Sequence, residues 1–142
     1  MTATPYDDKN IFARILRGEL PCFRVYEDDR TLAFMDIMPQ SEGHTLVIPK
    51  EPAATLFDIS PAMLADTIQV TQKVARAVQA VTQAPGVMIA QFNGAEAGQT
   101  VPHLHFHIIP RRHGEALRLH ASEKADMEQL RQLAERIKQQ LT

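Results

Sequence analysis

The sequence H-L-H-F-H-I-I, residues 103–109, places three of the chain's six histidines at every second position. Because side chains alternate between the two faces of a β-strand, a strand here would put His103, His105 and His107 on one face. The apolar residues between them would then point to the opposite face, where we expect a hydrophobic core. The pattern therefore predicts a strand that is apolar on one side and lined with imidazoles on the other.

Three imidazoles on one strand face allow three interpretations. They can be polar residues on a solvated face, ligands of a metal ion, or an anion site that holds a nucleophile. Thr, Lys or Glu would fill a solvated strand face equally well, so three histidines in strict alternation are unusual on such a face. Strand geometry disfavours a single ion, because residues i and i+4 lie roughly 13 Å apart. His44 could supply a further metal ligand, so a metal-binding module stays an alternative.

The segment before the histidines, A-E-A-G-Q-T-V-P at residues 95–102, is rich in small residues. Gly98 permits a positive φ and a close approach of the backbone, and successive backbone N–H groups in a tight turn bind anions. The side chains of Gln99 and Thr100 add an amide donor and a hydroxyl donor. Alone this loop is a weak signal, but beside three imidazoles it predicts a phosphate site with a nitrogen nucleophile next to it.

The composition narrows the class of protein. The 142 residues are 44% hydrophobic and 23% charged, which is typical of one globular domain. The formal net charge of -2 gives no reason to expect nucleic acid or an anionic membrane as a partner. The single cysteine, Cys22, excludes an intramolecular disulfide. The sequence contains no apolar run of membrane-spanning length and no N-terminal hydrophobic segment, so we expect a cytoplasmic protein.

Hydrophobic periodicity and turn signals indicate an α+β fold. Ser60 followed by Pro61 is a good start for a long central helix. The buried face of that helix is expected to contain Leu64, Ile68, Thr71, Ala75 and Val78, widened by Val70, Val74 and Val81. The patterns predict helices over residues 10–18, 60–83 and 122–141, and strands over residues 22–26, 31–35, 44–49, 87–93 and 103–109. Five strands with helices between them and at the ends favour one antiparallel sheet.

The histidine stretch resembles the signature of the histidine triad (HIT) family, His-φ-His-φ-His-φ-φ with φ apolar, and it matches every position. G-Q-T-V, at residues 98–101, is similar to the residues that usually precede the signature in the family. Further likeness lies in I-F-A-R-I-L-R-G-E-L-P (11–21), V-Y-E-D-D-R-T-L-A-F-M-D-I-M-P-Q (25–40) and H-T-L-V-I-P-K (44–50). The resemblance implies a HIT domain over residues 10–112, after a flexible N-terminus (1–9) and before a C-terminal extension with an amphipathic helix (113–142).

The resemblance also implies a fold and an activity. The HIT-like fold is a five-stranded antiparallel sheet with two main helices, here followed by a C-terminal helix, in a homodimer whose sheets join. The implied activity is hydrolysis of a purine nucleotide at the α-phosphate through a nucleotidyl-histidine intermediate, with no cofactor. Nucleoside phosphoramidates are the expected substrates and dinucleoside polyphosphates the alternative. A nucleotide-binding regulatory protein with little turnover is the alternative of another class.

The resemblance assigns roles to four histidines. His105 is the implied nucleophile, and its chemistry fits because a neutral imidazole has a lone pair near physiological pH and leaves readily. His103 and His107 flank it and would contact phosphate oxygens or the leaving group. His44 matches a fourth histidine of the family that supports the other three. A strand-start histidine satisfied by a carbonyl explains His44 equally well.

The implied substrate-binding residues lie in two segments. Asp36 and Ile37 match positions that hold the nucleoside, with the Asp36 carboxylate accepting from the ribose hydroxyls. A turn residue ahead of Pro39 is the simpler explanation of Asp36. Backbone groups near Gly98 and Thr100, with the side chains of Gln99 and Thr100, would meet the charge that builds in the transition state. Phe12, Leu32 and Ile11 could form an apolar slot for the base, although core packing explains each of them as well.

The chain departs from the family pattern at two places. Some family members carry a Cys-x-x-Cys zinc pair where this sequence has Asn10 and Ala13, so we expect no structural zinc. Phe92 stands where family members often have asparagine, and Asn93 or Gln91 could substitute for that amide.

Overall fold

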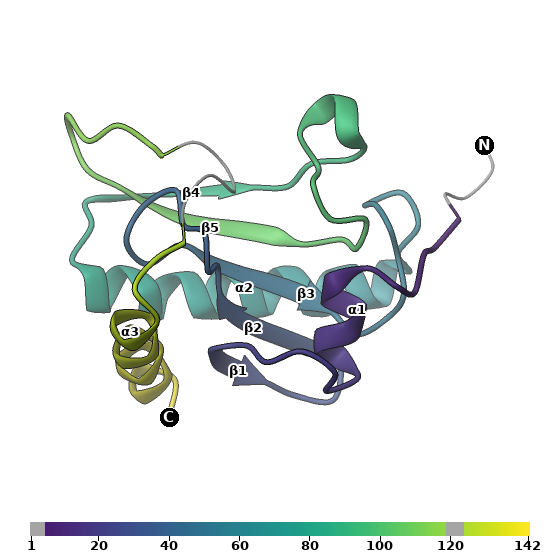
Figure 1. Cartoon of the computed structure of the whole chain (residues 1–142), viewed down its shortest axis with the longest axis horizontal. Coiled ribbons are helices and arrows are strands. Elements are labelled where there is room, and N and C mark those ends of the chain that lie inside the picture. Colours follow the sequence, from purple (N-terminus) through teal and green to yellow (C-terminus); the bar gives the residue numbers. More distant parts are fainter. Residues whose placement is uncertain (1–4, 119–123) are drawn as a thin grey trace.

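Figure 1 shows the computed structural model of the chain, which describes residues 5–118 and 124–142. Five strands form one sheet in the order β1-β2-β3-β5-β4, and every neighbouring pair is antiparallel. The strands are β1 (Arg24–Glu27), β2 (Thr31–Met35), β3 (Thr45–Pro49), β4 (Gly86–Ala90) and β5 (Phe106–Arg111). The α+β fold with a five-stranded antiparallel sheet is confirmed, with β1 and β4 as the edge strands.

The helices lie on both faces of this sheet. In Figure 1, α2 (Pro61–Thr82) runs behind the strands, and α1 (Ile11–Leu16) lies in front of them. The C-terminal helix α3 (Met127–Gln140) packs beside α2, and a short 3₁₀ turn, η1 (Ala95–Ala97), precedes β5. No helix within the described ranges has the length and apolar character to cross a membrane.

Each α-helix begins at a polar side chain that accepts a hydrogen bond from a backbone N–H of the first turn. Asn10 accepts from Ala13, Ser60 from Met63 and Asp126 from Gln129. Such caps satisfy backbone donors that have no partner within the helix. The start of the long helix at Ser60-Pro61 is therefore confirmed.

The sheet separates two apolar clusters. On the α2 side, Ala33 and Met35 of β2 join Val74, Val78 and residues of α3. On the α1 side, Leu32 and Phe34 of the same strand pack with Phe12. Alternate residues of one strand thus enter opposite clusters, as the pleat requires. Leu32 is therefore a core residue, which was the alternative to its place in a slot for the base.

The two longer helices, α2 and α3, each bury one face. Ile68 was expected on the buried face of α2 but is 43% exposed, whereas Val70 and Val74, which were expected to widen that face, are buried. The amphipathic helix expected in the C-terminal extension is α3, which buries Leu130, Leu133, Ala134 and Ile137, whereas Met127 at its first turn is 40% exposed. The predicted start of this helix at Ser122 falls partly on residues outside the described ranges.

The strands β4 and β5 differ most from their predicted ranges. β4 ends at Ala90, after which the side-chain amides of Gln91 and Asn93 bond to one another. β5 begins only at Phe106, because the backbone N–H of Leu104 donates to Ala53 in a loop rather than to a neighbouring strand. The prediction of a continuous strand through His103 and His105 is therefore wrong. The alternation still holds, since Leu104, Phe106 and Ile108 all enter the α2-side cluster.

Candidate active site

The structure holds the ring of His105 in one orientation. Its Nδ1 lies 2.7 Å from the carbonyl oxygen of His103, which can only accept a hydrogen bond. Nδ1 therefore carries the proton of the neutral ring, and the lone pair is on Nε2. The edge-to-face contact with Phe12, at 4.9 Å between ring centroids and 89° between planes, fixes the ring further. The arrangement presents one oriented basic nitrogen.

His103 is turned into the protein instead of toward a ligand. Its ring is fully buried, with Nε2 2.8 Å from the carbonyl oxygen of Pro49 and Nδ1 2.6 Å from the hydroxyl of Tyr6. Burial lowers the pKa of His103, so the ring is neutral at physiological pH. Both ring nitrogens already have protein partners, which differs from the expectation that this histidine contacts phosphate oxygens.

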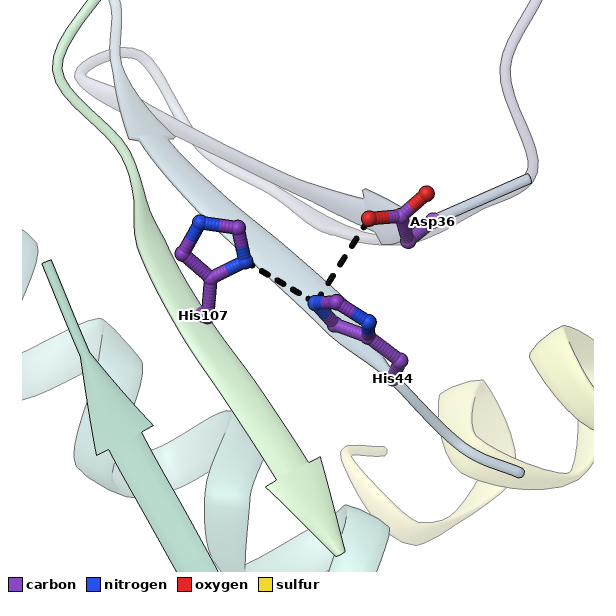
Figure 2. A group of neighbouring side chains, drawn as sticks. All are labelled: Asp36, His44 and His107. Carbon is purple, nitrogen blue, oxygen red and sulfur yellow. Dashed lines mark hydrogen bonds and ion pairs between the residues drawn. The ribbon is translucent and has the colours of Figure 1, made fainter. Parts of the chain in front are cut away.

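His107 of β5 is joined to His44, which lies just before the neighbouring strand β3 (Figure 2). The Nε2 of His44 lies 2.9 Å from Nδ1 of His107 and 3.5 Å from a carboxylate oxygen of Asp36. On the other side of the His44 ring, Nδ1 accepts from the backbone N–H of Gln40 at 3.0 Å. This places the proton of neutral His44 on Nε2, which donates to His107. His107 in turn carries its own proton on Nε2.

The side chains of Asp36, His44 and His107 also meet the distance requirement for a metal site, since their ligand atoms lie within 4.8 Å of one another. The hydrogen bond from Gln40 argues against that use. A neutral histidine that binds a metal through Nε2 must carry a proton on Nδ1. That proton would face the Gln40 N–H, so two donors would oppose each other. The geometry fits a hydrogen-bonded group of side chains better than a metal centre.

A cavity of about 180 Å³ opens beside His105 and His107. Whole-ligand pockets usually have about 300–1,000 Å³, so this cavity suits one part of a ligand, such as a nucleobase. Most of its wall is apolar and comes from α1, β2 and the loops beside them. The lining residues are Ile11, Phe12, Ile15, Pro21, Cys22, Phe34, Met35, Asp36, Ile37, Met38, Leu46, Thr100, Val101, His105 and His107. The predicted site residues that share this cavity are therefore Asp36, Ile37, Thr100, His105 and His107.

The loop before β5 is arranged differently from the expected anion-binding turn. The backbone N–H groups of Ala97, Gly98 and Gln99 donate to carbonyl groups within the loop itself. The side chain of Gln99 accepts from Gly94 N–H and donates to the carbonyls of Ala54 and Val101. These groups hold the loop in shape, and Gly98 with a φ of 103° lets the chain turn toward the cavity.

The predicted polar residues Asn93 and Asp36 both have partners in the protein. The Asn93 side-chain oxygen accepts from the backbone of Leu56 and from Gln91. One oxygen of Asp36 accepts from the backbone N–H of Met38, so Asp36 is a turn residue ahead of Pro39, which was one of its two predicted roles. Its other oxygen lies beside His44. Asn93 thus joins two loops, whereas Asp36 both shapes its turn and faces the cavity.

Sequence reasoning missed two residues that position these groups. Tyr6 binds His103, although it lies in a segment predicted to be flexible, and Gln40 orients His44. Tyr6 is the one aromatic residue among the first nine residues, which was the available signal. Gln40 acts through its backbone N–H, so its residue type gives no signal of this role. The C-terminal extension adjoins the same loop, since Ala125 and Arg118 donate to the carbonyls of Ile37 and Gln40.

Comparison with known proteins places the chain in a family. Residues 17–114 match the HIT domain. This chain belongs to the HIT domain family. A Hit-like protein from Bartonella henselae, described as involved in cell-cycle regulation, has 48% sequence identity and superposes with a TM-score of 0.92 over 97% of this chain and 100% of its own.

Two curated relatives of this HIT protein have named activities. The adenosine 5'-monophosphoramidase of Schizosaccharomyces pombe is 43% identical over 71% of this chain and 73% of its own length. The adenylylsulfatase of Arabidopsis thaliana is 38% identical over 75% of this chain and 54% of its own length. The two names share an adenylyl group and differ in what is bonded to it.

Proposed function

We propose that this HIT protein hydrolyses purine nucleoside phosphoramidates at the α-phosphorus through a nucleotidyl-His105 intermediate. The observation that carries the proposal is the bond from His105 Nδ1 to the His103 carbonyl, which leaves the lone pair on Nε2. A fixed tautomer is what a histidine nucleophile requires, because attack through the protonated nitrogen is not possible. The cavity beside that ring supplies space for the base of the nucleoside.

The reaction then proceeds in two displacements. Nε2 of His105 forms a bond to the α-phosphorus as the bond from phosphorus to the amine nitrogen breaks. The departing amine takes up a proton from solvent, and the Nε2–H of His107 can donate a hydrogen bond to a phosphate oxygen or to the departing group. Water next attacks the same phosphorus, the bond to His105 breaks, and a nucleoside monophosphate leaves. Dividing one displacement into two avoids a direct attack of water on the stable substrate.

The charge of the side chains that line the cavity favours an amine over a polyphosphate as the leaving group. Among the described residues that line the cavity, the charged side chain is the carboxylate of Asp36, with no lysine or arginine. Proteins that hold polyphosphates use such cations, or a metal ion, to balance the negative charge. A protonated amine departs without negative charge and needs no such partner. We therefore place phosphoramidates before dinucleoside polyphosphates and adenylyl sulfate as substrates.

The nucleoside is proposed to lie between α1 and the loop after β2. Ile11 and Phe12 of α1 and Ile37 of that loop give an apolar wall for the base, and Asp36 is available to accept from the ribose hydroxyls. Thr100 approaches the phosphate from the opposite loop. Gly98 and Gln99 shape that loop, and Asn93 joins it to the segment around Leu56.

We also propose that the protein forms a homodimer through β4 and α2. β4 is an edge strand, and Ile89 on it is 44% exposed beside the 43% exposed Ile68 of α2. Together they border an open groove of about 450 Å³. An edge strand next to an apolar groove can pair with a second copy of itself. Ile89→Asp should yield a monomer in light scattering while Phe57→Asp, at another exposed apolar residue, leaves the mass unchanged; a wild-type monomer would contradict the dimer.

The function is tested by presenting three adenylyl compounds to the purified protein. Adenosine 5'-phosphoramidate should be cleaved faster than diadenosine polyphosphate or adenylyl sulfate at equal concentration. His105→Asn should abolish cleavage and retain binding of adenosine monophosphate, because the asparagine keeps the pocket but not the nucleophile. Faster cleavage of the polyphosphate would contradict the leaving-group argument. Undiminished turnover by His105→Asn would contradict the mechanism.

A further inference from the structure

The segment before α1 brings one side chain to the histidines from the far end of the sequence. The Tyr6 hydroxyl lies 2.6 Å from Nδ1 of His103, 97 positions away, and the two rings meet edge to face at 5.6 Å between centroids. His103 has no exposed surface. Tyr6 thus supplies a polar partner at a position that bulk water does not reach.

The direction of this hydrogen bond follows from the other nitrogen of the ring. Nε2 of His103 faces the carbonyl oxygen of Pro49, so it carries the proton and Nδ1 carries the lone pair. The Tyr6 hydroxyl must therefore donate. Burial raises the pKa of Tyr6 and lowers that of His103, so both groups keep these neutral forms at physiological pH.

The same residue, His103, supplies the carbonyl that accepts from Nδ1 of His105. A rotation of its side chain and backbone would displace that acceptor. We propose that Tyr6 is a positioning residue, which holds His103 so that its carbonyl keeps His105 in the attacking tautomer. This inference rests on the proposed function, because it assigns a purpose to the orientation of the nucleophile.

The segment that carries Tyr6 is itself held against α1. The side chain of Asn10, which caps this helix, donates to the carbonyl of Asp7 at 2.8 Å. The guanidinium of Arg17, just after the helix, donates to the carbonyl of Asp8. The backbone on the C-terminal side of Tyr6 is therefore fixed by two contacts, which gives the hydroxyl a defined position over His103.

The test compares Tyr6→Phe with Tyr26→Phe, which removes a hydroxyl that bonds Asp28 beside the edge strand β1. With adenosine 5'-phosphoramidate, Tyr6→Phe should lower kcat about tenfold or more and change KM less than twofold. The acidic limb of its kcat profile should move to higher pH, because His103 is protonated more easily without a donor on Nδ1. Tyr26→Phe should match the wild type in all three quantities.

Unchanged kcat and pH profile in Tyr6→Phe would overturn the proposal, as would a loss seen equally in Tyr26→Phe. Nitrogen-15 NMR of the wild-type histidines gives a test that requires no turnover and no variant. The proposal expects a protonated Nε2 on His103 and a protonated Nδ1 on His105 at neutral pH, and the reverse tautomer of either ring would overturn it. If the wild type cleaves no adenylyl compound, the proposed function fails, while the tautomers still test the contact itself.

Discussion

His44 donates a hydrogen bond from Nε2 to Nδ1 of His107 at 2.9 Å, and its own Nδ1 accepts from the backbone of Gln40. The two bonds fix the tautomers of both rings. His44→Leu removes both, and should lower kcat about 10-fold to 100-fold, which corresponds to roughly 1–3 kcal/mol of lost hydrogen bonding. His44→Gln, which can both accept and donate, should recover part of the rate. Equal activity of the two variants would show that the hydrogen bonds do not matter.

Gly43 directly precedes His44, just before β3, and has a backbone conformation that a side chain at this position would disturb. Its φ is 95°, and an added Cβ would lie 2.7 Å from a methyl carbon of Thr82. Gly43→Ala should cost about 2–4 kcal/mol of unfolding free energy, from the left-handed backbone and from crowding. Gly18→Ala, with a φ of 78° and open space, should cost only about 1–2 kcal/mol. Urea unfolding measures both, and equal costs would contradict the crowding argument.

The buried His103 makes stability depend on pH. Its folded pKa lies below the ordinary value of 6.5, so the unfolded chain binds more protons between those two values. The stability that neutral His103 contributes is fully present above about pH 6.5 and is lost as the pH falls below that value. The unfolding free energy then changes by up to about 1.4 kcal/mol per pH unit. In urea unfolding between pH 7.5 and 5.5, His103→Gln should show a flatter dependence than the exposed control His113→Gln. Parallel curves for the two variants would refute this.

Metal removal should leave the reaction intact. The orientation of His44 by Gln40 fits a proton on Nε2 better than a metal ion. We expect the same kcat for the phosphoramidate before and after dialysis against EDTA, with zinc measured in both samples. A loss of activity that added zinc restores would indicate that Asp36, His44 and His107 bind a metal in solution.

The sequence predicted those parts of the molecule that depend on local pattern. The helix start at Ser60-Pro61, the strand near residues 31–35 and the apolar side of the histidine stretch follow from short-range patterns, and the structure has them. Strand ends were less predictable, because they depend on partners distant in sequence. β5 starts late since Leu104 bonds to Ala53, a contact that no local rule predicts.

The site was predictable in its residue types and less so in its contacts. Strict alternation predicted that His103 and His107 flank His105 on one face and contact a ligand, but Pro49 and Tyr6 engage the first ring, and His44 bonds the third. Gln99 similarly offered an amide for a phosphate, and the fold directs it into the loop. Which polar groups face a ligand depends on long-range hydrogen bonds, because buried donors and acceptors find partners wherever the fold brings them.

The central claim is a transient bond between His105 and phosphorus, and rapid-quench mass spectrometry tests it most directly. Wild-type protein mixed with adenosine 5'-phosphoramidate and quenched within one turnover should carry one adenylyl group, located by fragmentation on His105. Turnover that proceeds with no adenylyl adduct on the protein at any quench time, as direct attack of water on phosphorus would give, would contradict the account. An adduct on another histidine would contradict it equally.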